Sequence, residues 1–103
     1  MDHEIRAKKS ARRKVLRNDR RKWLYEYLLG HPCVDCGETD PVVLEFDHRR
    51  GDKEIEISRA VNNWSLPRLC EEITKCDVLC ANCHARRTAV DHGWLSATLH
   101  YLG

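Results

Sequence analysis

The first part of the chain combines an apolar pattern of helical period with many positive charges. Its apolar side chains recur at helical spacing, and they are Val15, Leu16, Trp23, Leu24, Tyr27 and Leu28. Gly30 and the nearby Pro32 end this pattern. We therefore predict one helix over residues 4–29, with a first half too polar to pack strongly on its own.

The following residues alternate short apolar segments with turns. Residues 41–46 are rich in β-forming side chains and predict a strand, whereas residues 54–57 alternate apolar and acidic side chains, which favours a second strand or an extended segment. Three further helices are predicted, near residues 59–62, over about 66–75 with Ser65 as its N-cap, and from about Ala81 to near Gly93. This mixture predicts a small α+β fold.

The charge is distributed unevenly along the 103 residues. Residues 1–22 carry a formal charge of +7 and residues 23–103 carry −5, although the whole chain is only +2. A basic arm on an acidic body indicates an anionic partner such as nucleic acid, with a merely solvated basic helix as the alternative. We divide the chain into a basic helical arm (1–30), a compact domain (31–95) and a tail (96–103).

Other classes of protein are excluded by the composition. No segment approaches the roughly 20 apolar residues that a membrane-spanning helix needs, so no membrane partner is expected. The N-terminus has no apolar leader segment, which predicts a location in the reducing cytoplasm of a bacterium or host cell. A chain this short buries a thin core and benefits from a stabilising clamp.

Six cysteines offer such a clamp. Four of them form two C-x2-C pairs, Cys33 with Cys36 and Cys80 with Cys83, separated by 43 residues. Paired thiolates at this spacing are typical of a tetrahedral structural Zn²⁺ site, which supplies roughly 10–16 kcal/mol of folding free energy in small modules. Disulfides or a redox pair are the alternatives, and a reducing compartment disfavours disulfides. The remaining Cys70 and Cys76 are expected to be buried as small hydrophobic residues.

Candidate catalytic chemistry lies beside these cysteines. Asp47 and His48 follow an apolar strand, and His84 directly follows Cys83. If both cysteine pairs bind one zinc ion, the ion holds together the segments that carry these three side chains. We then expect the three side chains to lie close enough to act on one substrate atom. Asp47 and His84 offer oxygen and nitrogen ligands for a divalent ion, and the imidazole of His48 is suited to accepting a proton near neutral pH. Such an arrangement serves metal-assisted phosphodiester cleavage.

These motifs resemble a known family. The order of Cys33-x-x-Cys36, Leu44-Glu45-Phe46-Asp47-His48 and Leu79-Cys80-Ala81-Asn82-Cys83-His84 is similar to that of the HNH endonucleases, particularly the small zinc-containing proteins common in phages and prophages. The resemblance covers about residues 31–93. It implies a ββα-metal, treble-clef-like core and a metal-dependent DNA endonuclease or nickase.

The resemblance also implies roles for individual residues. His48 would be the general base, Asp47 and His84 would hold a catalytic Mg²⁺ or Mn²⁺, and the four paired cysteines would hold structural zinc. Asn82 takes the role of the family's middle Asn, because the usual position for that residue is Lys75 here. Thr88 stands where the family often adds a further His or Asn. The implied products carry 3′-hydroxyl and 5′-phosphate ends.

Basic residues are expected to hold the DNA backbone. The predicted contacts are Arg49, Arg50, Arg86, Arg87, Arg12, Arg13, Arg20 and Arg21. By resemblance to the phage proteins, a packaging protein such as a terminase is a further expected partner. The alternative function is a non-catalytic zinc-stabilised module that binds nucleic acid without cutting it.

Overall fold

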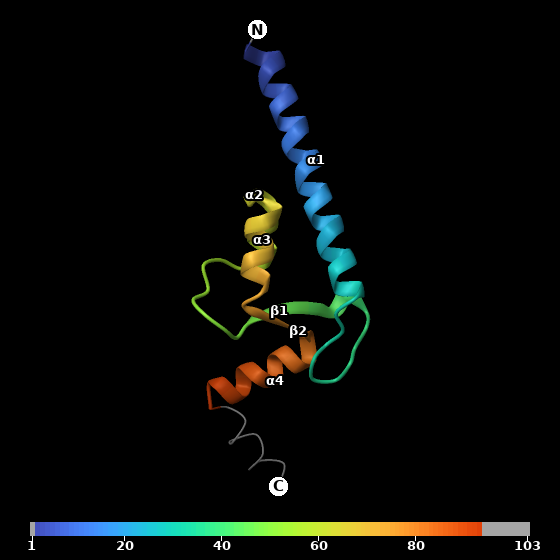
Figure 1. The fold of residues 1–103 in the computed structure, drawn as a ribbon, viewed down its shortest axis with the longest axis vertical. Coiled ribbons are helices and arrows are strands. Elements are labelled where there is room, and N and C mark those ends of the chain that lie inside the picture. Colours follow the sequence, from blue (N-terminus) through green and yellow to red (C-terminus); the bar gives the residue numbers. More distant parts are fainter. Residues whose placement is uncertain (1, 94–103) are drawn as a thin grey trace.

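The computed structural model describes residues 2–93. Its elements in chain order are α1 (Asp2–Leu29), the 3₁₀ helix η1 (Pro41–Val43), β1 (Leu44–His48), α2 (Ile57–Asn63), α3 (Leu66–Ile73), β2 (Cys76–Cys80) and α4 (Ala81–Asp91). Within these residues the fold is a small α+β arrangement with four α-helices and one antiparallel sheet of two strands. Figure 1 shows α1 running beside α2 and α3 and projecting beyond them, while α4 lies on the other side of the sheet. The predicted tail lies outside the described residues.

The two strands pair over their whole length. Leu44 is opposite Cys80 and His48 is opposite Cys76, so the end of β1 that carries the predicted catalytic pair meets the start of β2. The strand expected over residues 41–46 begins later, because Asp40 accepts a hydrogen bond from the backbone amide of Val42 and caps η1.

The extended segment expected over residues 54–57 does not join the sheet. Ile57 instead begins α2, where Ile57, Ala60 and Val61 are buried at the spacing of one helical face. The alternation of apolar and acidic residues before Ile57 imitated a strand, whereas the apolar period that decides the structure starts at Ile57 itself. Ser65 is confirmed as the N-cap of α3, since its side chain accepts from the amide of Arg68.

The core consists of two neighbouring clusters joined by aromatic side chains. One cluster contains Cys33, Leu44, Val78, Leu79, Cys80 and Cys83. The other contains Ile57, Ala60, Val61, Leu69, Ile73 and Cys76. Tyr27 and Phe46 pack against both clusters, so the second half of α1 is part of the body of the protein. The predicted arm boundary at residue 30 stays a prediction, but Arg20 of α1 forms hydrogen bonds to α2.

Candidate functional site

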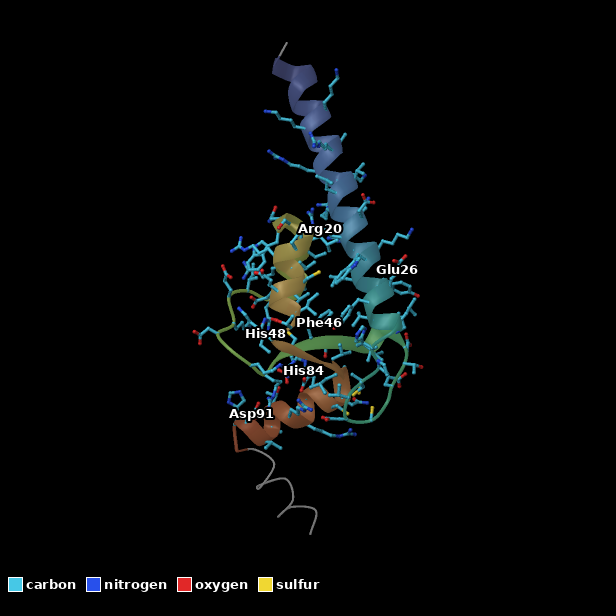
Figure 2. The ribbon with its side chains drawn as sticks, in the orientation of Figure 1. Arg20, Glu26, Phe46, His48, His84 and Asp91 are labelled. Atoms are coloured by element: carbon cyan, nitrogen blue, oxygen red, sulfur yellow. The ribbon has the colours of Figure 1, made fainter. Side chains whose placement is uncertain are left out.

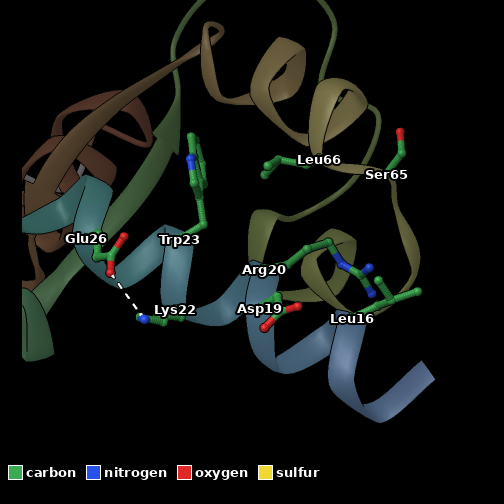
Figure 3. A pocket seen from close by; sticks show the side chains of 8 residues that line it. All are labelled: Leu16, Asp19, Arg20, Lys22, Trp23, Glu26, Ser65 and Leu66. Carbon is green, nitrogen blue, oxygen red and sulfur yellow. Dashed lines mark ion pairs between the residues drawn. The ribbon is translucent and has the colours of Figure 1, made fainter. Parts of the chain in front are cut away.

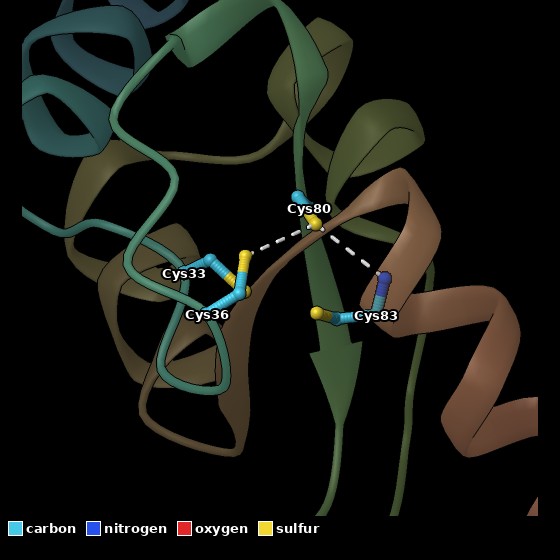
Figure 4. Close-up of side chains that lie close together, drawn as sticks. All are labelled: Cys33, Cys36, Cys80 and Cys83. Atoms are coloured by element: carbon cyan, nitrogen blue, oxygen red, sulfur yellow. Dashed lines mark hydrogen bonds between the residues drawn. The ribbon is translucent and has the colours of Figure 1, made fainter.

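The two cysteine pairs converge on one point. The sulfur atoms of Cys33, Cys36, Cys80 and Cys83 all lie within 4.8 Å of one another, and those of Cys36 and Cys80 are 3.6 Å apart (Figure 4). Zn–S bonds of about 2.3 Å in a tetrahedron place sulfur atoms about 3.8 Å apart, so this donor set fits zinc. The expected cysteine cluster is confirmed, and its geometry is suitable for a structural metal ion.

Backbone hydrogen bonds shape the first cysteine pair. The amide of Gly37 donates to the carbonyl of Cys33 over 2.9 Å, and Gly37 has a φ of +81°, which favours glycine. The amide of Val34 donates to the carbonyl of Val78 over 3.0 Å, which attaches this turn to β2. In the second pair, Cys80 caps α4 by accepting from the amide of Cys83. The sheet and α4 therefore bring the two pairs together.

The environments of the cysteines differ. Burial raises the pKa of the Cys33 thiol, but hydrogen bonds from the backbone of Cys80, Cys36 and Asp35 outweigh it and lower that pKa to about 6. Burial and the neighbouring sulfur atoms raise the pKa of Cys83 to about 12. Because zinc binds thiolates, metal binding here would release protons.

Asp47 and His84 lie together on the face of β1 that is turned toward α4. The Oδ1 atom of Asp47 is 3.5 Å from Nε2 of His84, and Oε1 of Glu45 is 3.3 Å from Nδ1 of the same imidazole. Adjacent ligand atoms around a six-coordinate Mg²⁺ are about 3.0 Å apart, so Asp47 and His84 are close to the separation that two such ligands need. Among the described side chains, those of residues 8–93, the four cysteines form the only group of three or more metal-binding side chains that lie close together.

Arg49 occupies the other side of the Asp47 carboxylate. Its guanidinium lies 3.4 Å from Oδ2 of Asp47 and donates to Asp91 over 2.8 Å. The Asp91 carboxylate is the main reason that the pKa of Arg49 is raised. Arg49 thus joins β1 to the end of α4 and is not a free phosphate ligand in this arrangement.

His48 contacts a different set of residues. Its Nε2 atom lies 2.9 Å from Oε2 of Glu72 on α3, and its side chain is only 9% exposed. Successive residues of a strand point to opposite faces, so His48 and Asp47 lie on opposite sides of the sheet. Figure 2 shows His48 between the sheet and α3, and His84 between the sheet and α4. The structure therefore brings Asp47 to His84 but does not bring His48 into contact with either.

Glu72 is the centre of a buried polar network that the sequence analysis did not identify. Its side chain is 2% exposed and also accepts from Nζ of Lys75 over 2.7 Å and from the amide of Glu54 over 3.1 Å. Burial alone would raise the pKa of Glu72, but the bonds from Lys75, Glu54 and His48 lower it to about 2. A signal was present, because Glu72 lies three residues after buried Leu69 on the same helix face.

Most of the basic side chains predicted to contact DNA also contact protein groups in this structure, and their DNA contacts stay predictions. Arg50 binds Asp77, and Arg87 binds Asp35 and Asp77, each over distances of 2.7–2.9 Å. Arg86 lies 3.6 Å from the sulfur of Cys83. On α1, Arg20 donates to the carbonyls of Val61 and Asn62, and Arg21 donates to the side chain of Asn62. Within the described residues, Arg12 and Arg13 form no ion pair.

The residue assigned to the middle Asn position is not bonded to the predicted metal ligands. Asn82 is exposed on the first turn of α4, and in residues 2–93 no hydrogen bond joins it to Asp47 or His84. Thr88 lies one turn after His84 and lines a cavity of about 290 Å³ with Glu45 and that histidine. The role of Asn82 stays a prediction.

His84 also lines a second cavity, of about 280 Å³, at the unpaired edge of β1. Its lining includes Glu45 from the face of the sheet that is turned toward α4. It also includes Phe46 and Ile57 from the opposite face. This edge is free in residues 2–93, because β1 pairs only with β2. His48 lies outside both linings. The cavities leave room beside His84 for a ligand approaching the edge of the strand.

A separate cavity of about 590 Å³ lies between α1 and the start of α3. Figure 3 shows Leu16 and Trp23 on one side of it and Leu66 on the other. It shares no lining residue with the two cavities at His84. Charged side chains from α1 line it beside the apolar ones, and none of the predicted metal ligands does.

Comparison with protein-family models, with curated proteins and with solved structures finds no match to this chain. None of the helices described by the structure has both the length and the apolar character needed to cross a membrane.

Proposed function

We propose that this protein is a metal-dependent nuclease or nickase of HNH type, which hydrolyses phosphodiester bonds of DNA. The observation that supports this proposal best is the 3.5 Å approach of Asp47 Oδ1 to His84 Nε2, on a strand whose next residue is His48. A carboxylate, an imidazole ligand and an imidazole base are the groups that such a reaction needs.

The proposed metal ligands lie on secondary-structure elements next to the four clustered cysteines. Asp47 belongs to β1, which pairs with β2, and His84 follows Cys83 on α4. A bound Mg²⁺ or Mn²⁺ would polarise the phosphate and stabilise the leaving oxygen. Two protein ligands suit such an ion, because Mg²⁺ retains waters and binds substrate phosphate oxygens. Arg49 must then release Asp47 or share its carboxylate with the ion.

Glu72 would orient the proposed base. An ionised carboxylate only accepts hydrogen bonds, so the Glu72 contact at 2.9 Å places a proton on Nε2 of His48. In the neutral imidazole, Nδ1 then keeps a lone pair with which it can accept a proton from water. Lys75 balances the negative charge of Glu72 from the other side.

The free edge of β1 offers a route by which one phosphate could reach both groups. Asp47 and His48 are consecutive and flank that edge from its two faces. The cavity of about 280 Å³ extends around the same edge and includes His84. A phosphate bound there would lie beside His84, and the buried His48 side chain would have to turn toward this edge to reach it.

Cleavage of supercoiled plasmid in Mg²⁺ or Mn²⁺ tests the proposal. We expect nicked or linear product from the natural protein, and a loss of at least about 100-fold in rate for His48→Ala. Asp47→Asn and His84→Ala should lose activity while retaining zinc, because neither residue belongs to the cysteine cluster. His92→Gln, a substitution at the C-cap of α4, is the matched histidine control and should retain cleavage. Equal cleavage by His48→Ala would reject His48 as the base.

The burial of His48 favours a second candidate function. A histidine that is 9% exposed and bonded to a buried carboxylate also suits a purely structural role. The protein would then be a zinc-stabilised module that binds nucleic acid without cutting it. Binding without cleavage in either metal, by protein with a full complement of zinc, would support this function.

A further inference from the structure

A polar cleft separates the basic half of α1 from the end of α2. It has a volume of about 520 Å³ and is lined by Ser10, Arg13, Lys14, Arg17, Arg21, Asn62 and Asn63. Four of these side chains are cationic, two are amides, and none is acidic or aliphatic. We refer to this site as the α1–α2 cleft.

The cations of the α1–α2 cleft are not neutralised by the protein. Within the described residues no ion pair involves Arg13, Lys14, Arg17 or Arg21, and the Nε atom of Arg17 is buried without a hydrogen-bond partner. The arginines of the body differ, since Arg49 and Arg87 bind carboxylates. The α1–α2 cleft therefore retains its positive charge for an external anion.

The walls of the cleft are held in place by a residue that does not line it. Arg20 donates from Nε to the carbonyl of Val61 over 2.7 Å and from its terminal nitrogen to the carbonyl of Asn62 over 2.8 Å. These bonds attach α1 to the C-terminal end of α2, and Figure 2 shows Arg20 at this junction. The α1–α2 cleft is thus a fixed corner between two helices, unlike the solvated surface of a single helix.

The spacing of its cations suits a repeating anion. Arg13, Arg17 and Arg21 are four residues apart, so they follow one face of α1 at intervals of about 6 Å. Guanidinium groups form paired hydrogen bonds with phosphate oxygens, and amide side chains add further donors. An acidic protein surface fits less well, because protein interfaces bury an apolar centre that this lining lacks.

We propose that the α1–α2 cleft binds the phosphodiester backbone of nucleic acid, through Arg13, Lys14, Arg17 and Arg21 on one wall and Asn62 and Asn63 on the other. The inference extends the proposed nuclease function by naming where its polymer is held. It assigns phosphate contacts to Lys14 and Arg17, and it gives Arg20 a positioning role. Its test uses binding alone and does not depend on whether the protein cleaves DNA.

The first experiment measures binding of a short labelled DNA duplex by the full chain, without added Mg²⁺ or Mn²⁺ and without a chelator. Arg13→Gln/Arg17→Gln should weaken binding about tenfold at moderate salt and should reduce the slope of log K against log salt by about 2. The matched control is Lys8→Gln/Lys9→Gln, which removes the same charge from exposed α1 positions outside the lining. Its affinity should fall less than about threefold. Equal losses in the two double variants, or no loss in either, would overturn the proposal.

A second experiment alters the opposite wall without changing α1. Asn63→Asp places a carboxylate in the cleft and should weaken duplex binding about threefold or more, whereas Asn18→Asp, at an exposed α1 position outside the lining, should have a smaller effect. Circular dichroism checks that both variants fold. The same effect in both variants would contradict a cleft with two walls.

Competitors identify the ligand. An RNA duplex of the same sequence tests whether the cleft prefers RNA or DNA. The duplex that binds with the higher affinity is the preferred ligand. Polyglutamate at equal charge should displace the DNA poorly. Displacement as effective as that by unlabelled DNA would instead indicate an acidic protein partner and would reject the proposal.

Discussion

His48 and Glu72 form a buried pair that links the sheet to α3. The Nε2 and Oε2 atoms are 2.9 Å apart, with 9% and 2% of the two side chains exposed. Lys75 binds the other carboxylate oxygen, so Lys75 balances the charge of Glu72 while His48 contributes a hydrogen bond. Removing one member of such a network leaves the others buried without their partner.

Glu72→Gln should therefore destabilise the protein strongly. The substitution retains the size of the side chain but removes the charge that Lys75 and His48 contact, and we expect a loss of about 3–5 kcal/mol in the free energy of unfolding. Urea denaturation measures this change. The exposed neighbour Glu71 provides the control, since Glu71→Gln should change stability by less than about 0.5 kcal/mol. Similar stability of the two variants would contradict the importance of the buried network.

The same carboxylate predicts how stability depends on pH. Its pKa is about 2 in the folded protein and 4.5 ordinarily, so its contribution is present above about pH 4.5 and is lost as the pH falls toward 2. The difference in stability between the natural protein and Glu72→Gln should therefore narrow over this range. Asp35 and Asp77, whose pKa values are lowered mainly by hydrogen bonds from Arg87 and Arg50 respectively, titrate in both proteins and cancel in the comparison. A constant difference down to pH 2 would count against this assignment.

Removal of a clustered cysteine should prevent zinc binding. Cys80→Ser takes away a sulfur ligand, although the serine hydroxyl can still cap α4. We expect loss of both bound zinc and folded structure, because the metal site then has only three sulfur ligands. Cys70→Ser is the control, because Cys70 lies outside the cluster and should leave one zinc per chain. Metal analysis and circular dichroism measure the two properties. Full zinc content in Cys80→Ser would show that the four sulfur atoms do not form the site.

Arg20 is expected to act on stability through the carbonyls of α2. Arg20→Ala removes two hydrogen bonds from a charged donor and should cost about 2–3 kcal/mol of unfolding free energy. Arg12→Ala, at an exposed position on the same helix, should cost less than about 0.5 kcal/mol. Unchanged stability of Arg20→Ala combined with weaker DNA binding would return Arg20 to the phosphate contacts predicted from the sequence.

Local chemistry in the sequence predicted the parts of the fold that depend on it. The two C-x2-C pairs predicted the cysteine cluster, because the spacing within each pair suits two ligands of one ion. Ser65 predicted the start of α3 by the chemistry of its side chain. The N-cap and the spacing within each cysteine pair are local features. Only the meeting of the two cysteine pairs depends on a contact between distant parts of the chain.

The remaining features depend on the three-dimensional arrangement. The pairing of His48 with Glu72 joins residues 24 positions apart and follows from how α3 packs on the sheet. Of the two alternatives predicted for residues 54–57, the strand was wrong and Ile57 belongs to α2, because alternating isoleucines resemble both a strand and the approach to a helix. Likewise, the sequence does not distinguish Arg20 from the other basic residues of α1, because its bond to the carbonyl of Val61 depends on the packing of α2 beside α1.

The tetracysteine cluster also orders events during synthesis on the ribosome. Its last sulfur belongs to Cys83, whereas α1 ends at Leu29, so the cationic helix emerges long before the frame can close. Joining the ends of a loop of about fifty residues costs about 3–4 kcal/mol in chain entropy, which binding of a metal ion by the four sulfur atoms would offset. A metal bound by this cluster would therefore act only after Cys83 has been synthesised, and zinc starvation would leave the body without its clamp after the cationic segment has emerged.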